Sequence, residues 1–204
     1  AFFKEADFGT AGVRGLRGRS EIDSKNGQYL PGPNRINLDT IRRYTLAVAN
    51  YVLENGAKTR GVVIGYDTRI GSQQMAEETA KVLHRKGIKI FIFDSERPVA
   101  EIALAIIELD AFLGIEITAS HNSKNDNGYK ISNELGAQLF GAQRSVILEH
   151  IARVDIDDVR ELQLADVRLE AASRDGIRYI GRDVTDYHFD RAFIRKIKSF
   201  VLRW

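Results

Sequence analysis

The stretch GVVIGYDTRIGSQQMAEETAKVLHRKGIKIFIFD, residues 61–94, decides the fold, because it contains a strand, a helix and a second strand in succession. Its two ends, 61–67 and 88–94, are short apolar runs with the length expected of buried strands. Between these runs three residues recur at helical spacing: Met75, Thr79 and Leu83. Ser72 is expected to cap this helix and Gly87 to close it. Strands joined through a helix predict a parallel pair.

Outward from this unit, the same strand and helix patterns recur in both directions. Further elements are expected at these positions: a strand at 111–117, helices from Asn37 or Asp39 to Gly56, from Pro98 to Leu109 and through 146–151, and short strands at 129–132 and 137–140. Residues 1–37, rich in Gly, Arg, Asn and Pro, are expected to be mostly loop with one irregular hairpin, and 183–204 a terminal amphipathic helix. The alternation predicts an α/β fold, a three-layer α/β/α arrangement with a mixed, largely parallel sheet.

The composition is that of an ordinary globular protein. Of the 204 residues, 44% are hydrophobic and 28% are charged, and the net charge is only +2. This balance gives no support for a nucleic-acid partner. The absence of cysteine excludes disulfides and thiolate metal sites. No apolar run approaches the roughly 20 residues of a membrane span and no signal-peptide pattern opens the chain, so a cytoplasmic location is the default expectation.

The polar stretch TASHNSKNDNGYK, residues 118–130, follows the third strand and is the main candidate for a functional site. Ser120 lies three residues beyond Ile117, where side chains project from the carboxyl edge of a parallel sheet. Small and polar residues let backbone N–H groups approach a phosphate, and His121 and Lys130 can offset its charge. A phosphoserine, with about −1.5 to −2 charges, needs such surroundings.

Two other interpretations of this stretch stay open from the residues alone. Composition by itself favours an Asn-rich surface turn between two strands, since Asn tolerates left-handed backbone. A serine hydrolase is disfavoured, because the residues around Ser120 lack the Gly-x-Ser-x-Gly elbow.

The same stretch resembles the active-site serine loop of the alpha-D-phosphohexomutases, whose pattern is Thr-x-Ser-His-Asn-Pro-x-x-x-Asn-Gly-x-Lys. The spacing matches from Thr118 to Lys130, with Ser123 in place of the usual proline, which should loosen the turn. Three more stretches match in family order: FGTAGVRG (8–15), IGYDTR (64–69) and RPVAEIALAI (97–106). The resemblance spans nearly the whole chain, and the phosphoglucomutases are its nearest match within the family.

This resemblance implies a set of roles. Ser120 would carry a phosphoryl group and exchange it with a sugar bisphosphate, so that glucose 1-phosphate and glucose 6-phosphate interconvert. Lys130 and His121 would assist proton transfer and stabilise charge, and Arg14 would sit beside the phosphoserine. Three residues would help to bind phosphate or substrate: Thr10, Asn122 and Asn127. A Mg²⁺ ion would bind an oxygen of the Ser120 phosphate, and glucose 1,6-bisphosphate would act as activator and intermediate.

Several parts of the family's cleft have no counterpart in this sequence: the Asp-Gly-Asp-x-Asp-Arg metal loop, the sugar-selecting loop and the distal phosphate loop. DIDDVR, residues 155–160, imitates the metal loop, but acidic residues at a helix start explain it better. We therefore expect residues 1–204 to be a single domain resembling domain I of a four-domain phosphohexomutase, with 183–204 leading toward a second domain. Such a chain is expected to be incomplete and inactive alone, with the remaining domains and a phosphosugar as partners. The alternative is a free-standing, non-catalytic module that binds sugar phosphates or regulates.

The remaining charged residues favour structural roles. Asp67 and Arg69 are expected to form a contact that holds the serine loop. Three histidines lie on expected helices at no metal-ligand spacing, so each is expected to be solvated or packed: His84, His150 and His188. The basic residues of the terminal helix are expected to lie on a solvated face and to complement the helix dipole, rather than to bind nucleic acid.

Overall fold

The computed structural model describes residues 8–9, 12–18, 34–164, 167, 169, 176–181 and 189–201. Within these ranges seven strands form one sheet in the order β1-β2-β6-β5-β3-β4-β7. Their bounds are β1 (Phe8–Gly9), β2 (Gly12–Leu16), β3 (Val62–Tyr66), β4 (Ile90–Phe93), β5 (Leu113–Ile117), β6 (Asp126–Asn133) and β7 (Ile177–Ile180). Four strands, β5-β3-β4-β7, run parallel, while β6, β2 and β1 continue the sheet in antiparallel pairs. The mixed sheet is confirmed.

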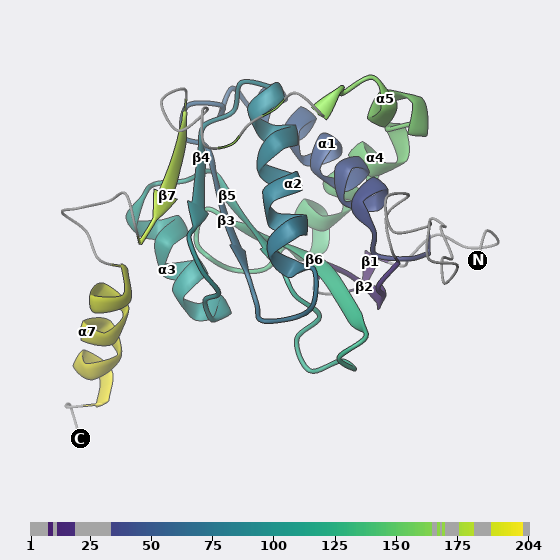
Figure 1. The fold of residues 1–204 in the computed structure, drawn as a ribbon. Helices are drawn as coiled ribbons and strands as arrows, with labels where there is room; N and C mark the ends of the chain where they lie inside the picture. The colour runs from purple at the N-terminus through teal and green to yellow at the C-terminus, as the bar shows by residue number, and fades with distance from the viewer. Residues whose placement is uncertain are drawn as a thin grey trace.

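Helices cover both faces of this sheet (Figure 1). Their bounds are α1 (Leu38–Glu54), α2 (Ser72–Arg85), α3 (Val99–Glu108), α4 (Gly141–Arg153), α5 (Ile156–Arg160) and α7 (Phe189–Val201). Side chains of α1, α2, α4 and α5 share one core with the sheet, while α3 and the first residue of α7 share a second core on the opposite face. The expected three-layer α/β/α architecture is therefore confirmed.

Alternation along the strands separates these two cores, because successive side chains of a strand point to opposite faces. In β4, Ile90 and Ile92 join the larger core, and Phe91 and Phe93 join the one beneath α3. The strands β3 and β4 are buried on both sides, which is why the runs 61–67 and 88–94 are almost continuously apolar. The register leaves the carboxyl ends of β3 and β5 side by side, with Tyr66 opposite Ile117.

Most helix boundaries follow the sequence signals, with one exception that bears on the site. Asn37 caps α1 as expected: its Oδ1 accepts the backbone N–H of Thr40 at 2.9 Å. Ser72 does not cap α2. The cap position is Gly71, in left-handed backbone, and Ser72 is the first helical residue. The prediction fails because Asp67 captures the Ser72 hydroxyl, which donates to Oδ1 at 2.7 Å.

Two expectations about short strands differ from the structure. The strand expected at 137–140 is wrong: only an isolated bridge joins Gln138 to Ser132. The strand expected at 129–132 is longer, since β6 runs from Asp126 to Asn133.

The two ends of the chain are described in part. The irregular hairpin expected near the N-terminus is present as β1 and β2. In the C-terminal segment, α7 begins at Phe189, and residues 182–188 and 202–204 lie outside the described ranges. Among the described helices, none has the length and apolar content needed to cross a membrane.

Candidate active site

The loop between β5 and β6 carries Ser120 at the carboxyl edge of the parallel strands. Ser120 is exposed and has left-handed backbone, with φ of 57°. Its N–H donates to the Thr118 hydroxyl at 3.0 Å, which closes a tight turn immediately after the strand. A non-glycine residue in this conformation costs free energy and persists only where its surroundings impose it, and such residues cluster at functional sites.

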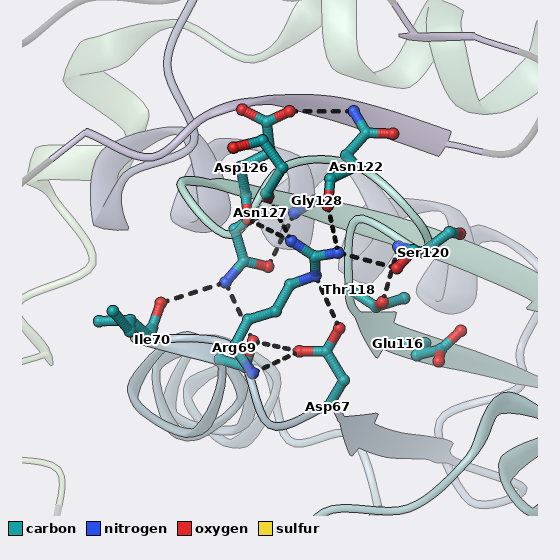
Figure 2. A network of polar contacts seen from close by, with 12 residues as sticks. Asp67, Arg69, Ile70, Glu116, Thr118, Ser120, Asn122, Asp126, Asn127 and Gly128 are labelled. Atoms are coloured by element: carbon teal, nitrogen blue, oxygen red, sulfur yellow. Dashed lines mark hydrogen bonds and ion pairs between the residues drawn. The ribbon is translucent and has the colours of Figure 1, made fainter.

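Arg69 imposes the shape of this loop (Figure 2). Its guanidinium is mostly buried, is held by the Asp67 carboxylate at 3.1 Å, and donates to four backbone carbonyl oxygens of the loop. These four acceptors are Ser120 at 2.8 Å, Asn122 at 2.9 Å, Ser123 at 2.6 Å and Asp126 at 3.1 Å. The expected structural contact between Asp67 and Arg69 is therefore present, and it organises the loop from the turn that follows β3.

A second set of bonds fixes the far end of the loop. Asn127 is completely buried, and its Nδ2 donates to the Ser72 hydroxyl at 3.0 Å. Its Oδ1 accepts the N–H of Gly128 at 2.8 Å. Asn127 thus links β6 to the start of α2 through Ser72 and Asp67. In this geometry it supports the loop, and a direct contact with phosphate stays a prediction.

The loop borders an open cleft of about 650 Å³ at the carboxyl ends of β3 and β5, beside the start of α3. Of the residues expected at the site, Ser120, Lys130 and Asn122 line this cleft. Asn122 also donates to the Asp126 carboxylate at 3.1 Å. Lys130 projects from β6 with its side chain mostly buried.

His121 and Arg14, which were also expected at the site, are not among the residues that line this cleft. His121 is exposed on the loop. Arg14 lies on β2 opposite Gly128, and a Cβ on that glycine would come 3.2 Å from the Arg14 Cγ. Thr10 lies outside the described residues.

Three charged residues of the cleft were not expected from the sequence: Glu116, Lys124 and Arg97. Lys124 is exposed on the loop. Arg97 is ion-paired with Asp190 at 2.8 Å and with Asp94 at 3.5 Å. Glu116 is buried, and its Oε2 lies 3.7 Å from the Lys130 ammonium.

Burial raises the pKa of Glu116, while the neighbouring Lys130 pulls that pKa down and the charge of Asp67 adds to the increase. A carboxylate in an otherwise apolar strand, in the run FLGIEI, was the available signal for this residue.

The described residues contain no group of three or more His, Cys, Asp or Glu side chains that could hold a metal ion. The acidic run 155–160 begins a helix, as expected: Asp155 caps α5, and the carboxylate of Asp158 accepts the Asp155 N–H at 2.7 Å. His150 is buried against the ring of Tyr51, 3.5 Å from a Glu54 oxygen, and is packed as expected. His188 lies outside the described residues.

The match to a known family decides how this cleft is to be understood. A family model described as "Phosphoglucomutase/phosphomannomutase, alpha/beta/alpha domain I" matches residues 5–157. The chain belongs to this family. The match contains the loop, Arg69, Glu116 and Lys130, and its description agrees with the three layers seen in the structure.

Relatives of known sequence extend the match along the chain of this phosphohexomutase domain. The phosphoglucomutase of Staphylococcus saprophyticus is 34% identical over 195 residues, which cover 95% of this chain and 31% of the relative. The glucose 1,6-bisphosphate synthase of Mus musculus is 38% identical over 152 residues, which cover 71% of this chain and 22% of the relative. The chain thus spans a third or less of the length of these relatives.

Solved structures support the fold of the domain. A candidate phosphomannomutase of Thermus thermophilus superimposes with a TM-score of 0.62 at 23% identity, over 95% of this chain and 44% of the other. The open form of parafusin from Paramecium, a phosphoglucomutase, gives a TM-score of 0.55 at 17% identity, over 74% of this chain and 27% of the other. The three-layer domain is therefore shared with larger proteins of the family.

Proposed function

We propose that this chain is the phosphoserine-bearing domain of a phosphohexomutase that interconverts glucose 1-phosphate and glucose 6-phosphate through phosphorylated Ser120. The observation that carries the proposal is the exposed Ser120, held in left-handed backbone at the mouth of a cleft that also contains Lys130. The phosphoglucomutase and glucose 1,6-bisphosphate synthase relatives support a glucose phosphate as substrate.

The proposed reaction consists of two phosphoryl transfers that balance. In the first, the bond between phosphorus and Ser120 Oγ breaks and a new bond forms to a hydroxyl oxygen of the sugar monophosphate. The hydroxyl proton leaves to a base, Ser120 Oγ takes up a proton, and the product is a sugar bisphosphate. In the second transfer the bond between the other phosphorus and its sugar oxygen breaks, and a bond to Ser120 Oγ forms. Ser120 Oγ gives up its proton, that sugar oxygen gains one, and the isomeric monophosphate is left. Such transfers depend mainly on positioning and electrostatic stabilisation.

The chain's own groups have distinct parts in this scheme. Lys130 supplies a positive charge in the cleft, where the low dielectric strengthens its interaction with a phosphate. His121 and Arg14 are proposed to approach the phosphoryl group from the exposed side of the loop and from β2. Arg69 does not bind the phosphate, because its donors already serve loop carbonyls and Asp67.

The described residues do not by themselves fit a Mg²⁺ site. Among the carboxylates near Ser120, Asp67 serves Arg69 and Ser72, Asp126 serves Asn122, and Glu116 is paired with Lys130. We propose that, within the described part of this domain, a phosphate oxygen on Ser120 is the only ligand to Mg²⁺. The other ligands would come from regions that the longer relatives possess and that do not match this chain. Glucose 1,6-bisphosphate remains the proposed activator and intermediate.

The remaining domains of such an enzyme are the proposed partners of this one. Residues 1–204 would act as a single domain, with the segment that contains α7 leading toward a second domain. The isolated chain is then expected to turn over glucose 1-phosphate poorly, because the cleft would lack its sugar-selecting and distal phosphate loops.

Phosphorylation of Ser120 tests the proposal directly. Incubation of the chain with glucose 1,6-bisphosphate should add one phosphate, found by intact mass and assigned to Ser120 by peptide mapping. Ser120→Ala should abolish this addition. Ser123→Ala, which alters another exposed hydroxyl of the same loop, should leave it unchanged.

The other outcomes of the same experiment identify the rival functions. An adduct of a fluorophosphonate probe on Ser120, without phosphorylation, would support a hydrolase. A chain that binds sugar phosphate but acquires neither modification would be the non-catalytic binding module.

A further inference from the structure

Glu116 places a negative charge, which repels the negative charge of the proposed ligand, at a buried position in the cleft beneath the serine loop. It lies on β5 directly opposite Lys130 of β6 in the antiparallel register, so both side chains leave the same face of the sheet. Glu116 is 7% exposed and Lys130 is 5% exposed. The pair is therefore removed from water, and each charge compensates the other.

The contact between the two side chains is an ion pair without close hydrogen bonding. The ammonium nitrogen lies 3.7 Å from Glu116 Oε2, beyond hydrogen-bond distance. Within the described part of the chain, this buried Oε2 has no hydrogen-bond partner. A buried carboxylate with an unfilled acceptor position is costly, so such a group is expected to have a use.

The other charged groups that surround Glu116 do not replace Lys130 as its partner. They come from the end of β3, from the serine loop and from the segment before α3: Asp67, Arg69, Lys124 and Arg97. The negative charge of Asp67 repels that of Glu116. The guanidiniums of Arg69 and Arg97 are held by Asp67 and by Asp190. Lys124 is exposed on the loop. Lys130 is thus the cation whose charge Glu116 controls.

We propose that Glu116 is a positioning residue that holds the Lys130 ammonium in the cleft and competes for it with the phosphate at Ser120. This inference deepens the proposed function, on which it rests for the nature of the ligand. While the cleft is empty, the carboxylate neutralises Lys130. When a dianion arrives, Lys130 turns to it, and the buried carboxylate becomes uncompensated and takes up a proton from solvent. Glu116 thereby weakens the grip on phosphate and favours its release.

Sulfate binding measures this competition without any chemistry at Ser120. Sulfate has the shape and charge of a phosphate dianion and does not titrate near neutrality, so any proton taken up belongs to the protein. Calorimetric titration at about pH 6 in buffers of different ionisation heats gives both the affinity and the number of protons. For the unmodified chain, we expect sulfate binding to be accompanied by proton uptake.

Glu116→Gln should bind sulfate roughly tenfold more tightly with less proton uptake, because one opposing charge is gone. The double variant Glu116→Gln/Lys130→Met should lose this gain, since the gain acts through Lys130. Glu78→Gln is the matched control. It removes another buried carboxylate, one paired with Arg42 and Lys81 away from the cleft, and should leave sulfate affinity unchanged.

The inference is overturned if folded Glu116→Gln binds sulfate no more tightly than the unmodified chain, or if neither protein binds sulfate. If circular dichroism shows that Glu116→Gln does not fold, proton uptake by the unmodified chain decides alone, and its absence overturns the inference. The Ser120 mapping stands apart from this test. If Ser120 is phosphorylated but Glu116→Gln does not change sulfate binding, only the inference about Glu116 fails. If Glu116→Gln tightens sulfate binding but Ser120 is not phosphorylated, only the proposed mutase function fails.

Discussion

A single guanidinium shapes the serine loop, so the properties of that loop are properties of Arg69. The side chain reaches from the end of β3 to four carbonyl oxygens of a segment more than fifty positions away in the sequence. In return these carbonyls, together with Asp67, satisfy the donors of a mostly buried cation. Ser120 keeps its left-handed backbone because this arrangement leaves no relaxed alternative.

Replacement of Arg69 by Met should therefore lower the free energy of unfolding by about 2–3 kcal/mol, because it leaves carbonyls and Asp67 without their charged partner. It should also raise amide hydrogen exchange in the serine loop and slow phosphorylation of Ser120. Urea unfolding and exchange measured by mass spectrometry check both effects.

Arg153→Met is the control for this prediction. Arg153 is exposed and pairs with Glu149 at 3.8 Å. Its loss should change the unfolding free energy by less than about 0.5 kcal/mol. Equal effects of the two substitutions would contradict the role given to Arg69.

At this scale the sequence identified residue types better than partners. The Asp67–Arg69 contact was expected, since the two lie two positions apart after a strand. The carbonyl acceptors of Arg69 were not, because backbone oxygens carry no signal in the sequence. Glu116 was visible as a carboxylate in an apolar run, but only the register with Lys130 gives it a partner.

The strand β5 combines a buried carboxylate with close-packed core contacts within five residues. Two residues before Glu116, Gly114 lies against α3, and a Cβ there would overlap the side chain of Ile106. Gly65 on β3 faces Ile102 in the same way. These two glycines allow α3 to pack directly onto the strands, and the start of α3 forms one wall of the cleft.

Gly114→Ala should lower the free energy of unfolding by about 1–3 kcal/mol, since the new methyl group overpacks a completely buried contact. Ile106→Val in the same chain should recover part of this loss by removing the methyl group that clashes. Gly15→Ala is the control, because its Cβ would meet only Asn34 O at 3.6 Å. Thermal or urea unfolding of the four proteins tests the order, and a stable Gly114→Ala would contradict it.

Element positions were predictable where periodicity extends over several turns, as in α1 and α2. The cap of α2 was predicted wrongly at Ser72, because the Ser72 hydroxyl bonds to Asp67, in the turn before the helix, and to Asn127 on β6. The strand expected at 137–140 goes no further than a bridge to β6. The Leu139 N–H donates to Ile131 O at 3.1 Å and the Asn133 N–H donates to Ala137 O at 2.8 Å, but α4 begins at Gly141, so no longer ladder forms.

For the molecule as a whole, the attachment of α7 depends on a cluster of charges beside α3. Arg97 bonds to Asp190 on α7 and lies 3.7 Å from the buried Glu101. The ring of Phe189 packs edge-on against Phe93. The apolar side chains farther along α7 are exposed: Ile194, Ile197, Phe200 and Val201. Contacts near its first turn therefore hold this helix.

The stability of this attachment should depend on pH. Burial, together with the hydrogen bond and charge of Asp190, raises the pKa of Glu101 from 4.5 to about 7, against the opposing charge of Arg97. Because the folded state holds this proton more tightly than the unfolded state, the contribution of Glu101 to stability is present below about pH 4.5 and is lost as pH rises to about 7.

Glu101→Gln removes this titration and tests it. The difference in unfolding free energy between the unmodified chain and Glu101→Gln should fall as pH rises through this range. Denaturant unfolding at several pH values gives that difference, and a constant value would contradict the prediction. The sequence predicted α3 and a terminal helix that includes the described α7, but it could not predict this coupling, which joins residues about ninety positions apart.

The way in which Arg69 holds the loop has one more consequence, for the variation this protein can tolerate. A guanidinium that bonds to backbone carbonyl oxygens makes the same contacts whichever side chains those residues carry. Ser123, which stands where the family pattern has proline, therefore still binds Arg69, through its backbone carbonyl oxygen at 2.6 Å. Side-chain substitutions in the middle of the serine loop should thus be tolerated, while substitutions of Arg69 should not.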